Sequence, residues 1–184
     1  MSYLTSGRGA SGAPPAILFD PPAWWKAALA LVVALLLQTT LGHYVAIRGA
    51  VPGLVLLLVL WYGMRTDSPS GLLFGTIAGA CEDALAGWTG AAWTLSTALV
   101  GALAGRTAGT VITESRLWII PYAALATIVR YAVFAIVLRT EERAIPLPLT
   151  HAHELVWQAV LNAIIAYAVL NLIPRLGVSR VGLR

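Results

Sequence analysis

Residues 71–109 read GLLFGTIAGACEDALAGWTGAAWTLSTALVGALAGRTAG and carry two ladders of glycines spaced by four residues. Residues at this spacing lie on one face of an α-helix, so each ladder predicts a helix with one face free of side chains. The acidic pair Glu82 and Asp83 and the turn glycines Gly87 and Gly90 lie between the ladders. The stretch therefore predicts a hairpin of two helices packed through small residues. The ladders consist of Gly71, Gly75, Gly79, Gly101, Gly105 and Gly109.

The composition of the whole chain is that of a membrane protein. Of its 184 residues, 59% are hydrophobic and only 11% are charged, whereas soluble domains carry about 25% charged residues. A bilayer core of about 30 Å requires about 20 apolar residues per helix, so the length allows about six spans and no separate soluble domain. The net charge of +4 comes from basic residues scattered at span ends, and it does not indicate a nucleic-acid partner.

The predicted fold is an all-α membrane protein with six transmembrane helices in a single domain, residues 24–174. Residues 1–23 are rich in Gly, Ser and Pro and predict a flexible tail, and residues 175–184 form a short basic tail. The second span is short, so we expect it to begin earlier, near Tyr44. The predicted spans cover residues 24–41, 51–64, 70–86, 90–111, 117–138 and 154–173.

The distribution of Lys and Arg predicts that both termini are cytoplasmic. Cytoplasmic loops of membrane proteins carry an excess of these residues. One side of the membrane holds both tails, the loop between spans two and three and the loop between spans four and five. These segments and the span ends next to them carry Arg8, Lys26, Arg65, Arg106, Arg116, Arg175, Arg180 and Arg184. The opposite side carries only Arg48, Arg139 and Arg143.

The charged residues Glu82, Asp83 and Arg130 lie at a similar depth inside predicted spans. Asp83 follows Ser70 by 13 residues, and Arg130 follows Leu117 by 13 residues. Both therefore lie about 20 Å from the cytoplasmic ends of their spans, at a rise of about 1.5 Å per residue. Because intramembrane charges are costly and usually paired, we expect an ion pair of Arg130 with either Asp83 or Glu82. The pair either joins spans three and five, or lines a cavity or contacts a partner.

The glycine ladders have two possible roles. Small residues let helix backbones approach closely in lipid, where helix association depends on packing and polar contacts. The ladders therefore pack span three on span four, or one of them faces outward and receives a helix of a partner protein. In span six, Gln158 and Asn162 share a helix face, and we expect them to bond neighbouring helices.

No motif for a cofactor, a metal ion or a catalytic centre occurs in the sequence. His151 and His153 form an HxH motif, but zinc needs three or four ligands and no further cluster supplies them. Cys81 is the single cysteine, so no intramolecular disulfide can form. We predict no cofactor, no metal and no enzymatic activity.

The order of features resembles the MreD family of bacterial rod shape-determining proteins. Pro52-Gly53 opens an apolar run, a glycine-rich span ends in Asp83, a glycine turn follows at 87–90, and a Leu-rich span comes next. The resemblance is clearest over residues 52–109. This chain departs from the family at Glu82, where the family tends to have a small or apolar residue.

The resemblance implies a non-enzymatic, multi-pass subunit of the cell-elongation machinery in the cytoplasmic (inner) membrane. Such proteins bind the single-span scaffold MreC and support peptidoglycan synthesis by a RodA-type glycosyltransferase with a class B penicillin-binding protein. It also implies that residues 71–83 and the following turn form a family-specific surface. The partners expected for this chain are thus an MreC-like protein and membrane lipid.

A different class remains open, the substrate-binding S-component of an energy-coupling-factor vitamin transporter. These proteins also have six spans and dock through small residues spaced AxxxA, a spacing that Ala30 and Ala34 show here. Asp83 and Arg130 would then line a ligand pocket. An intramembrane enzyme is a third possibility, but the sequence assembles no set of catalytic residues.

Overall fold

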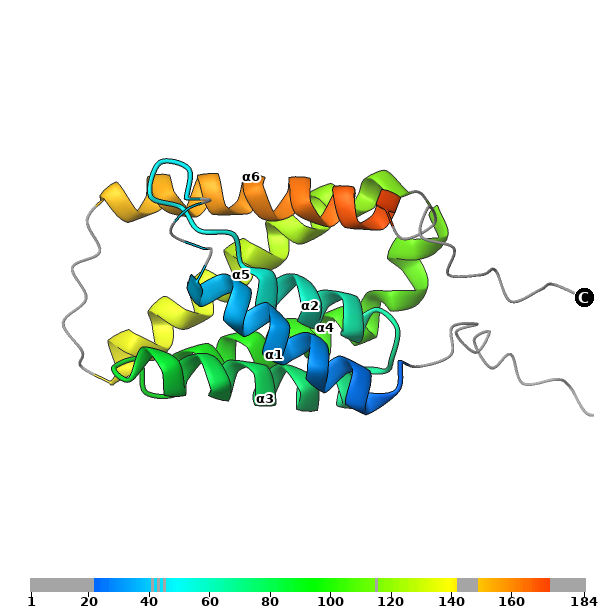
Figure 1. Cartoon of the computed structure of the whole chain (residues 1–184), viewed down its shortest axis with the longest axis horizontal. Helices are drawn as coiled ribbons and strands as arrows, with labels where there is room; N and C mark the ends of the chain where they lie inside the picture. Colours follow the sequence, from blue (N-terminus) through cyan, green and yellow to red (C-terminus); the bar gives the residue numbers. More distant parts are fainter. Residues whose placement is uncertain are drawn as a thin grey trace, which may run out of the picture.

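The computed structural model describes residues 22–40, 42, 44, 46–114, 116–141 and 149–172. Within these residues the protein is all-helical, with six α-helices and no strand (Figure 1). The predicted tails lie outside the described residues, apart from Pro22 and Ala23. The helices are α1 (Trp24–Thr40), α2 (Leu54–Gly63), α3 (Ser68–Ala86), α4 (Ala92–Glu114), the 3-10 turn η1 (Arg116–Trp118), α5 (Ile119–Thr140) and α6 (Leu149–Leu172).

The short helix α2 occupies the centre of the bundle. Val55 and Val59 pack against apolar residues of α1 and α3, among them Phe74. Leu56 and Leu60 lie on the opposite face and pack against α4 and α5. Van der Waals packing of these side chains holds α2 between its neighbours. In Figure 1, α3 and α6 lie along opposite edges of the molecule.

Local signals define the hairpin of α3 and α4. The Asp67 side chain accepts a hydrogen bond from the Ser70 N–H at 3.2 Å, and Pro69 lies in the first turn of α3. That bond lowers the pKa of the Asp67 carboxyl from its ordinary value. Gly87 ends α3 with a φ of 73°, in the left-handed region that glycine adopts without a steric penalty.

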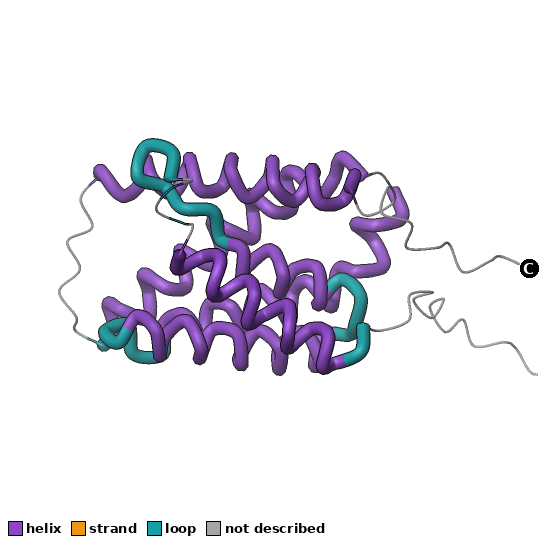
Figure 2. The backbone as a smooth tube through the Cα atoms, viewed as in Figure 1, coloured by secondary structure: helices purple, strands orange, loops and turns teal. Residues whose placement is uncertain are grey.

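The start of α2 differs from the prediction. We expected the helix to begin near Tyr44, but it begins at Leu54. Ile47 and Ala50 exchange two backbone hydrogen bonds around a tight turn, in which Gly49 has a φ of 87°. The expectation was wrong because it relied on the length that a span needs, whereas this turn diverts the backbone from the helical conformation. Figure 2 shows this loop beside α6, where the Arg48 guanidinium lies 5.0 Å from the ring centroid of Trp157.

The surface of the bundle is apolar along most of its helices. Among the described helices, α5 is long and apolar enough to cross a membrane, and α1, α2 and residues 153–169 of α6 are apolar but shorter. Large apolar side chains are exposed on the outward faces of five helices. They include Leu29, Val32, Leu73, Leu99, Ile128 and Ile164.

Candidate functional site

The glycines of α3 meet the backbone of α4 without intervening side chains. A Cβ atom added to Gly71 would lie 2.2 Å from the carbonyl oxygen of Gly101. A Cβ added to Gly75 would lie 2.5 Å from the carbonyl oxygen of Thr97, and one on Gly79 would lie 2.5 Å from that of Trp93. These distances are shorter than real van der Waals contacts, so the α3 ladder has room only for hydrogen at these positions.

The ladder of α4 faces the same seam. A Cβ on Gly101 would lie 2.1 Å from the carbonyl oxygen of Gly71, and one on Gly105 would lie 2.5 Å from that of Asp67. The surroundings of Gly109 lie outside the described residues. Gly63, at the end of α2, also approaches this seam, since its Cβ would lie 2.9 Å from the Gly101 carbonyl oxygen. Sequence reasoning missed Gly63, because a single glycine forms no ladder.

Glu82 and Arg130 form an ion pair where four helices meet. Only 8% of Glu82 and 4% of Arg130 are exposed. Gln38 of α1 donates its Nε2–H to Glu82 Oε1 at 3.1 Å, and Arg130 donates its Nε–H to Thr97 Oγ1 of α4 at 3.1 Å. The Arg130 guanidinium also lies 4.4 Å from the ring centroid of Trp93, a cation–π contact. Each buried charge therefore has a counter-charge and further hydrogen-bond partners.

Asp83 has a different environment from its neighbour. Its Oδ1 accepts from Thr89 Oγ1 at 2.6 Å and from the Trp93 N–H at 3.1 Å. Its Oδ2 accepts from the N–H and the hydroxyl of Thr94, at 2.8 and 2.7 Å. Trp93 and Thr94 lie in the first turn of α4, where N–H groups lack partners within the helix and the helix dipole favours a negative charge. Asp83 of α3 thus caps α4 and does not face Arg130.

Two amides of α6 tie that helix to the entry of α2. Asn162, which is fully buried, accepts from the Gly53 N–H at 2.8 Å and donates to Thr127 Oγ1 of α5 at 3.0 Å. Gln158 donates to the Val51 carbonyl oxygen at 3.0 Å. These bonds satisfy backbone groups in the non-helical residues that precede α2.

Gln38 was not singled out by sequence reasoning as a site residue. Its Oε1 accepts from the Val55 N–H at 3.1 Å while its Nε2 donates to Glu82. The feature of the sequence that could have indicated this role is the position of Gln38, an amide near the end of a largely apolar helix. Gln38 therefore connects α1, the first turn of α2 and the ion pair.

A cavity of about 300 Å³ with both polar and apolar lining residues lies beside the ion pair. Glu82 and Arg130 are buried in its wall, and the exposed Thr39 and Leu85 lie at its edge. The remaining lining residues come from α1, α3, α4, α6 and the segment before α2. They are Leu35, Gln38, Val51, Pro52, Ala86, Trp93 and Gln158.

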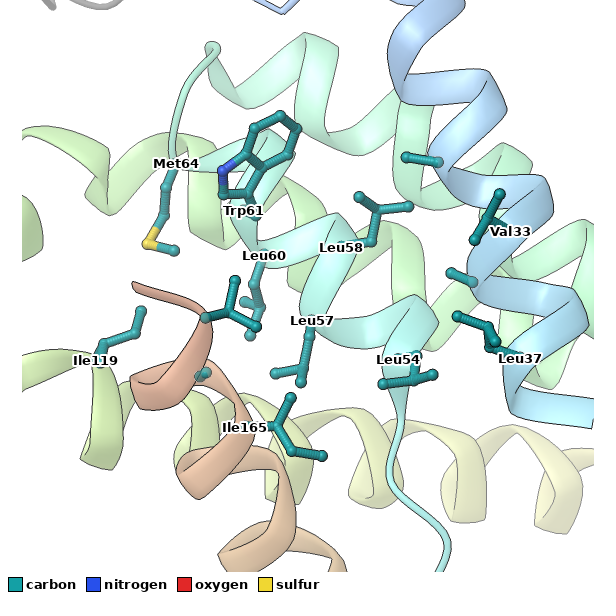
Figure 3. A pocket seen from close by; sticks show the side chains of 14 residues that line it. Val33, Leu37, Leu54, Leu57, Leu58, Leu60, Trp61, Met64, Ile119 and Ile165 are labelled. Carbon is teal, nitrogen blue, oxygen red and sulfur yellow. The ribbon is translucent and has the colours of Figure 1, made fainter. Parts of the chain in front are cut away.

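A second, apolar groove of about 450 Å³ separates α1 from α6 (Figure 3). Residues of α2 such as Leu57 and Trp61 form its floor, and Val33 and Leu37 of α1 face Ile165 of α6 across it. The small residues Ala30, Ala34 and Ala166 also line the groove.

The candidate metal motif does not assemble a site in the described part of the chain. The Trp157 Nε1–H donates to His153 Nε2 at 3.0 Å, and the side chain of His151 lies outside the described residues. No group of three or more His, Cys, Asp or Glu residues that could hold a metal ion occurs among the described residues.

The chain matches a known protein family. The model of the family described as "rod shape-determining protein MreD" matches residues 23–176, which include all six helices. No curated protein and no solved structure matches this chain. The matched family is not one of transporter subunits, and none of the comparisons favours the energy-coupling-factor alternative.

Proposed function

This chain belongs to the MreD family of rod shape-determining membrane proteins, and from this premise we propose that it is a non-enzymatic subunit of the bacterial cell-elongation complex. The family match over residues 23–176 is the observation that carries the proposal. The polar side chains at its centre fit this role, because Glu82, Arg130 and Asp83 all bond neighbouring helices of the same chain. In this role they hold the bundle together.

In the proposed arrangement the bundle crosses the cytoplasmic membrane six times, with both termini in the cytoplasm. The exposed apolar side chains on its outward faces suit contact with lipid. Helix α2 has ten residues and is about 15 Å long, which is half of a bilayer core. The non-helical residues 51–53, whose backbone groups are bonded by α6, complete this crossing inside the protein.

The proposed partner is the transmembrane helix of an MreC-like single-span protein, and its proposed site is the groove between α1 and α6. The glycine faces of α3 and α4 are filled by each other's backbones and leave no space for a third helix. The groove instead offers Ala30, Ala34 and Ala166, small residues that let a partner helix approach closely. An apolar helix lying in a groove is a common recognition mode. A RodA-type glycosyltransferase and a class B penicillin-binding protein would join through the same complex.

A pull-down from native membranes in mild detergent, followed by mass spectrometry, tests both the partner and its site. Val33→Trp fills the groove, and Val32→Trp is the matched control. The two valines are neighbours on α1 and are 47% and 52% exposed, but only Val33 lines the groove. We expect the wild-type protein and Val32→Trp to retain an MreC-like protein, and Val33→Trp to lose most of it.

Two results would contradict the proposal. Equal recovery of the scaffold protein with both variants would exclude the groove as its site. Recovery of paired ATPases with a transporter membrane subunit, in place of an MreC-like protein, would favour the S-component of an energy-coupling-factor transporter.

A further inference from the structure

The cavity beside Glu82 and Arg130 combines charged and amide side chains with an apolar lining. A buried carboxylate and a buried guanidinium lie in its wall, and the amides of Gln38 and Gln158 lie beside them. Leu35, Val51, Pro52 and other apolar residues complete the lining. Because Thr39 and Leu85 at the edge are exposed, the cavity is reached from the surface between α1 and α3.

The charges of the cavity restrict the class of ligand. Glu82 and Arg130 neutralise each other, and removing either partner would leave a buried charge without compensation. A purely anionic or purely cationic ligand would compete with one member of the pair. A zwitterion adds a second counter-charge to each member without displacing the first. An ammonium group with N–H donors suits Glu82, and a phosphate suits Arg130.

The depth of the cavity in the bundle points to a lipid headgroup. Glu82 lies four residues before the end of α3 at Ala86, which corresponds to about 6 Å along the helix. The headgroup layer on each side of a bilayer is about 5–7 Å thick. In the membrane arrangement proposed above, α3 is about 28 Å long and nearly matches the hydrocarbon core, so the Glu82 carboxylate lies about one helical turn below the headgroup layer, within reach of a headgroup that enters beside Leu85.

We propose that this cavity binds the zwitterionic phosphoethanolamine headgroup of a membrane phospholipid. The ammonium group contacts Glu82, the phosphate contacts Arg130, and the acyl chains leave between Thr39 and Leu85 into the bilayer. This inference rests on the membrane arrangement proposed above, but it requires no partner protein.

Native mass spectrometry of the whole chain tests the proposal. The protein is reconstituted into nanodiscs with equal amounts of phosphatidylethanolamine, phosphatidylcholine and phosphatidylglycerol that carry the same acyl chains, and is then released in mild detergent. We expect about tenfold more phosphatidylethanolamine than phosphatidylcholine to be retained, because choline lacks the N–H donors for Glu82. Thr39→Phe blocks the entrance and should abolish this preference.

Thr40→Phe is the matched control. Thr39 and Thr40 are neighbours on α1, both are exposed, and each bonds a carbonyl oxygen one turn earlier, but only Thr39 lines the cavity. Thr40→Phe should retain the preference, and thermal unfolding of both variants checks that they remain folded. Equal retention of the three lipids, a preference for phosphatidylglycerol, or equal behaviour of the two variants would overturn the proposal.

A second arm distinguishes a lipid from a free small molecule. Soluble phosphoethanolamine is added to delipidated protein, and its effect on thermal unfolding is compared with that of phosphatidylethanolamine. We expect the lipid to raise the unfolding temperature and the soluble headgroup to have no effect at the same concentration. An equal shift would show that the acyl chains do not contribute, and would overturn the assignment to lipid. The two proposals can fail separately. If the pull-down recovers no scaffold protein but phosphatidylethanolamine is still retained, the proposed elongation complex is contradicted and the lipid site is not.

Discussion

The two sides of this bundle use small residues in opposite ways. Between α3 and α4, glycines bring the backbones together so closely that a single added Cβ atom would clash with a carbonyl oxygen. Between α1 and α6, the alanines Ala30, Ala34 and Ala166 line an open groove over α2. The difference shows that a small-residue spacing alone does not specify a contact. What matters is whether a second helix of the same chain reaches that face.

The polar groups are divided between the two sides as well. Asp83 is fully engaged inside the hairpin, where it caps α4. Glu82 points instead to the boundary of the hairpin with α1 and α5. The glycines and Asp83 thus bond or contact only groups within the hairpin and its immediate seam. We therefore propose the sites of a partner helix and of a lipid headgroup on the surfaces next to α1.

The largest expected effect concerns the ion pair that joins the hairpin to α5. Glu82→Leu or Arg130→Met alone should lower the free energy of unfolding by about 3–5 kcal/mol, because each leaves one buried charge without its partner. The double variant should lose less than either single variant. Thermal and denaturant unfolding in detergent would measure the free energy of unfolding of the wild-type protein, the two single variants and the double variant. Additive losses would mean that the two side chains are not coupled and that the hairpin is held by packing alone.

A moderate effect is expected within the seam. Gly75→Ala places a methyl group 2.5 Å from the Thr97 carbonyl oxygen and should cost about 1–3 kcal/mol, since a backbone atom cannot move aside easily. Ala80→Leu, on the exposed face of the same helix, is the control and should be nearly neutral. Equal stability of the two variants would show that the seam tolerates more volume than its distances indicate.

The smallest effect is expected in the groove, where the same kind of change meets open space. Ala30→Val adds two methyl groups at a position that lines the groove, and the free energy of unfolding should change by no more than about 0.5 kcal/mol. The same unfolding measurement applies. A loss as large as that of Gly75→Ala would mean that α1 and α6 are packed as tightly as the hairpin, and the contrast between the two sides would disappear.

Much of the architecture was accessible from the sequence. Apolar runs and the turn residues between them located six helical segments, and the helix boundaries agree to within a few residues except at the start of α2, expected near Tyr44, and of α6, expected at Glu154 but found at Leu149. The start of α2 could not be predicted, because amides of Gln38 and Asn162, distant in the chain, bond the backbone of Val55 and Gly53. A local pattern carries no information about such partners.

The family and the helical, apolar character of the chain were determined by the sequence itself, because residue spacing and composition encode helix faces and lipid compatibility. The choice between Glu82 and Asp83 as the partner of Arg130 was made only by the tertiary structure. Adjacent residues on an α-helix share almost the same depth but point about 100° apart. Depth can therefore be counted along the chain, whereas direction depends on how the helices are rotated against one another.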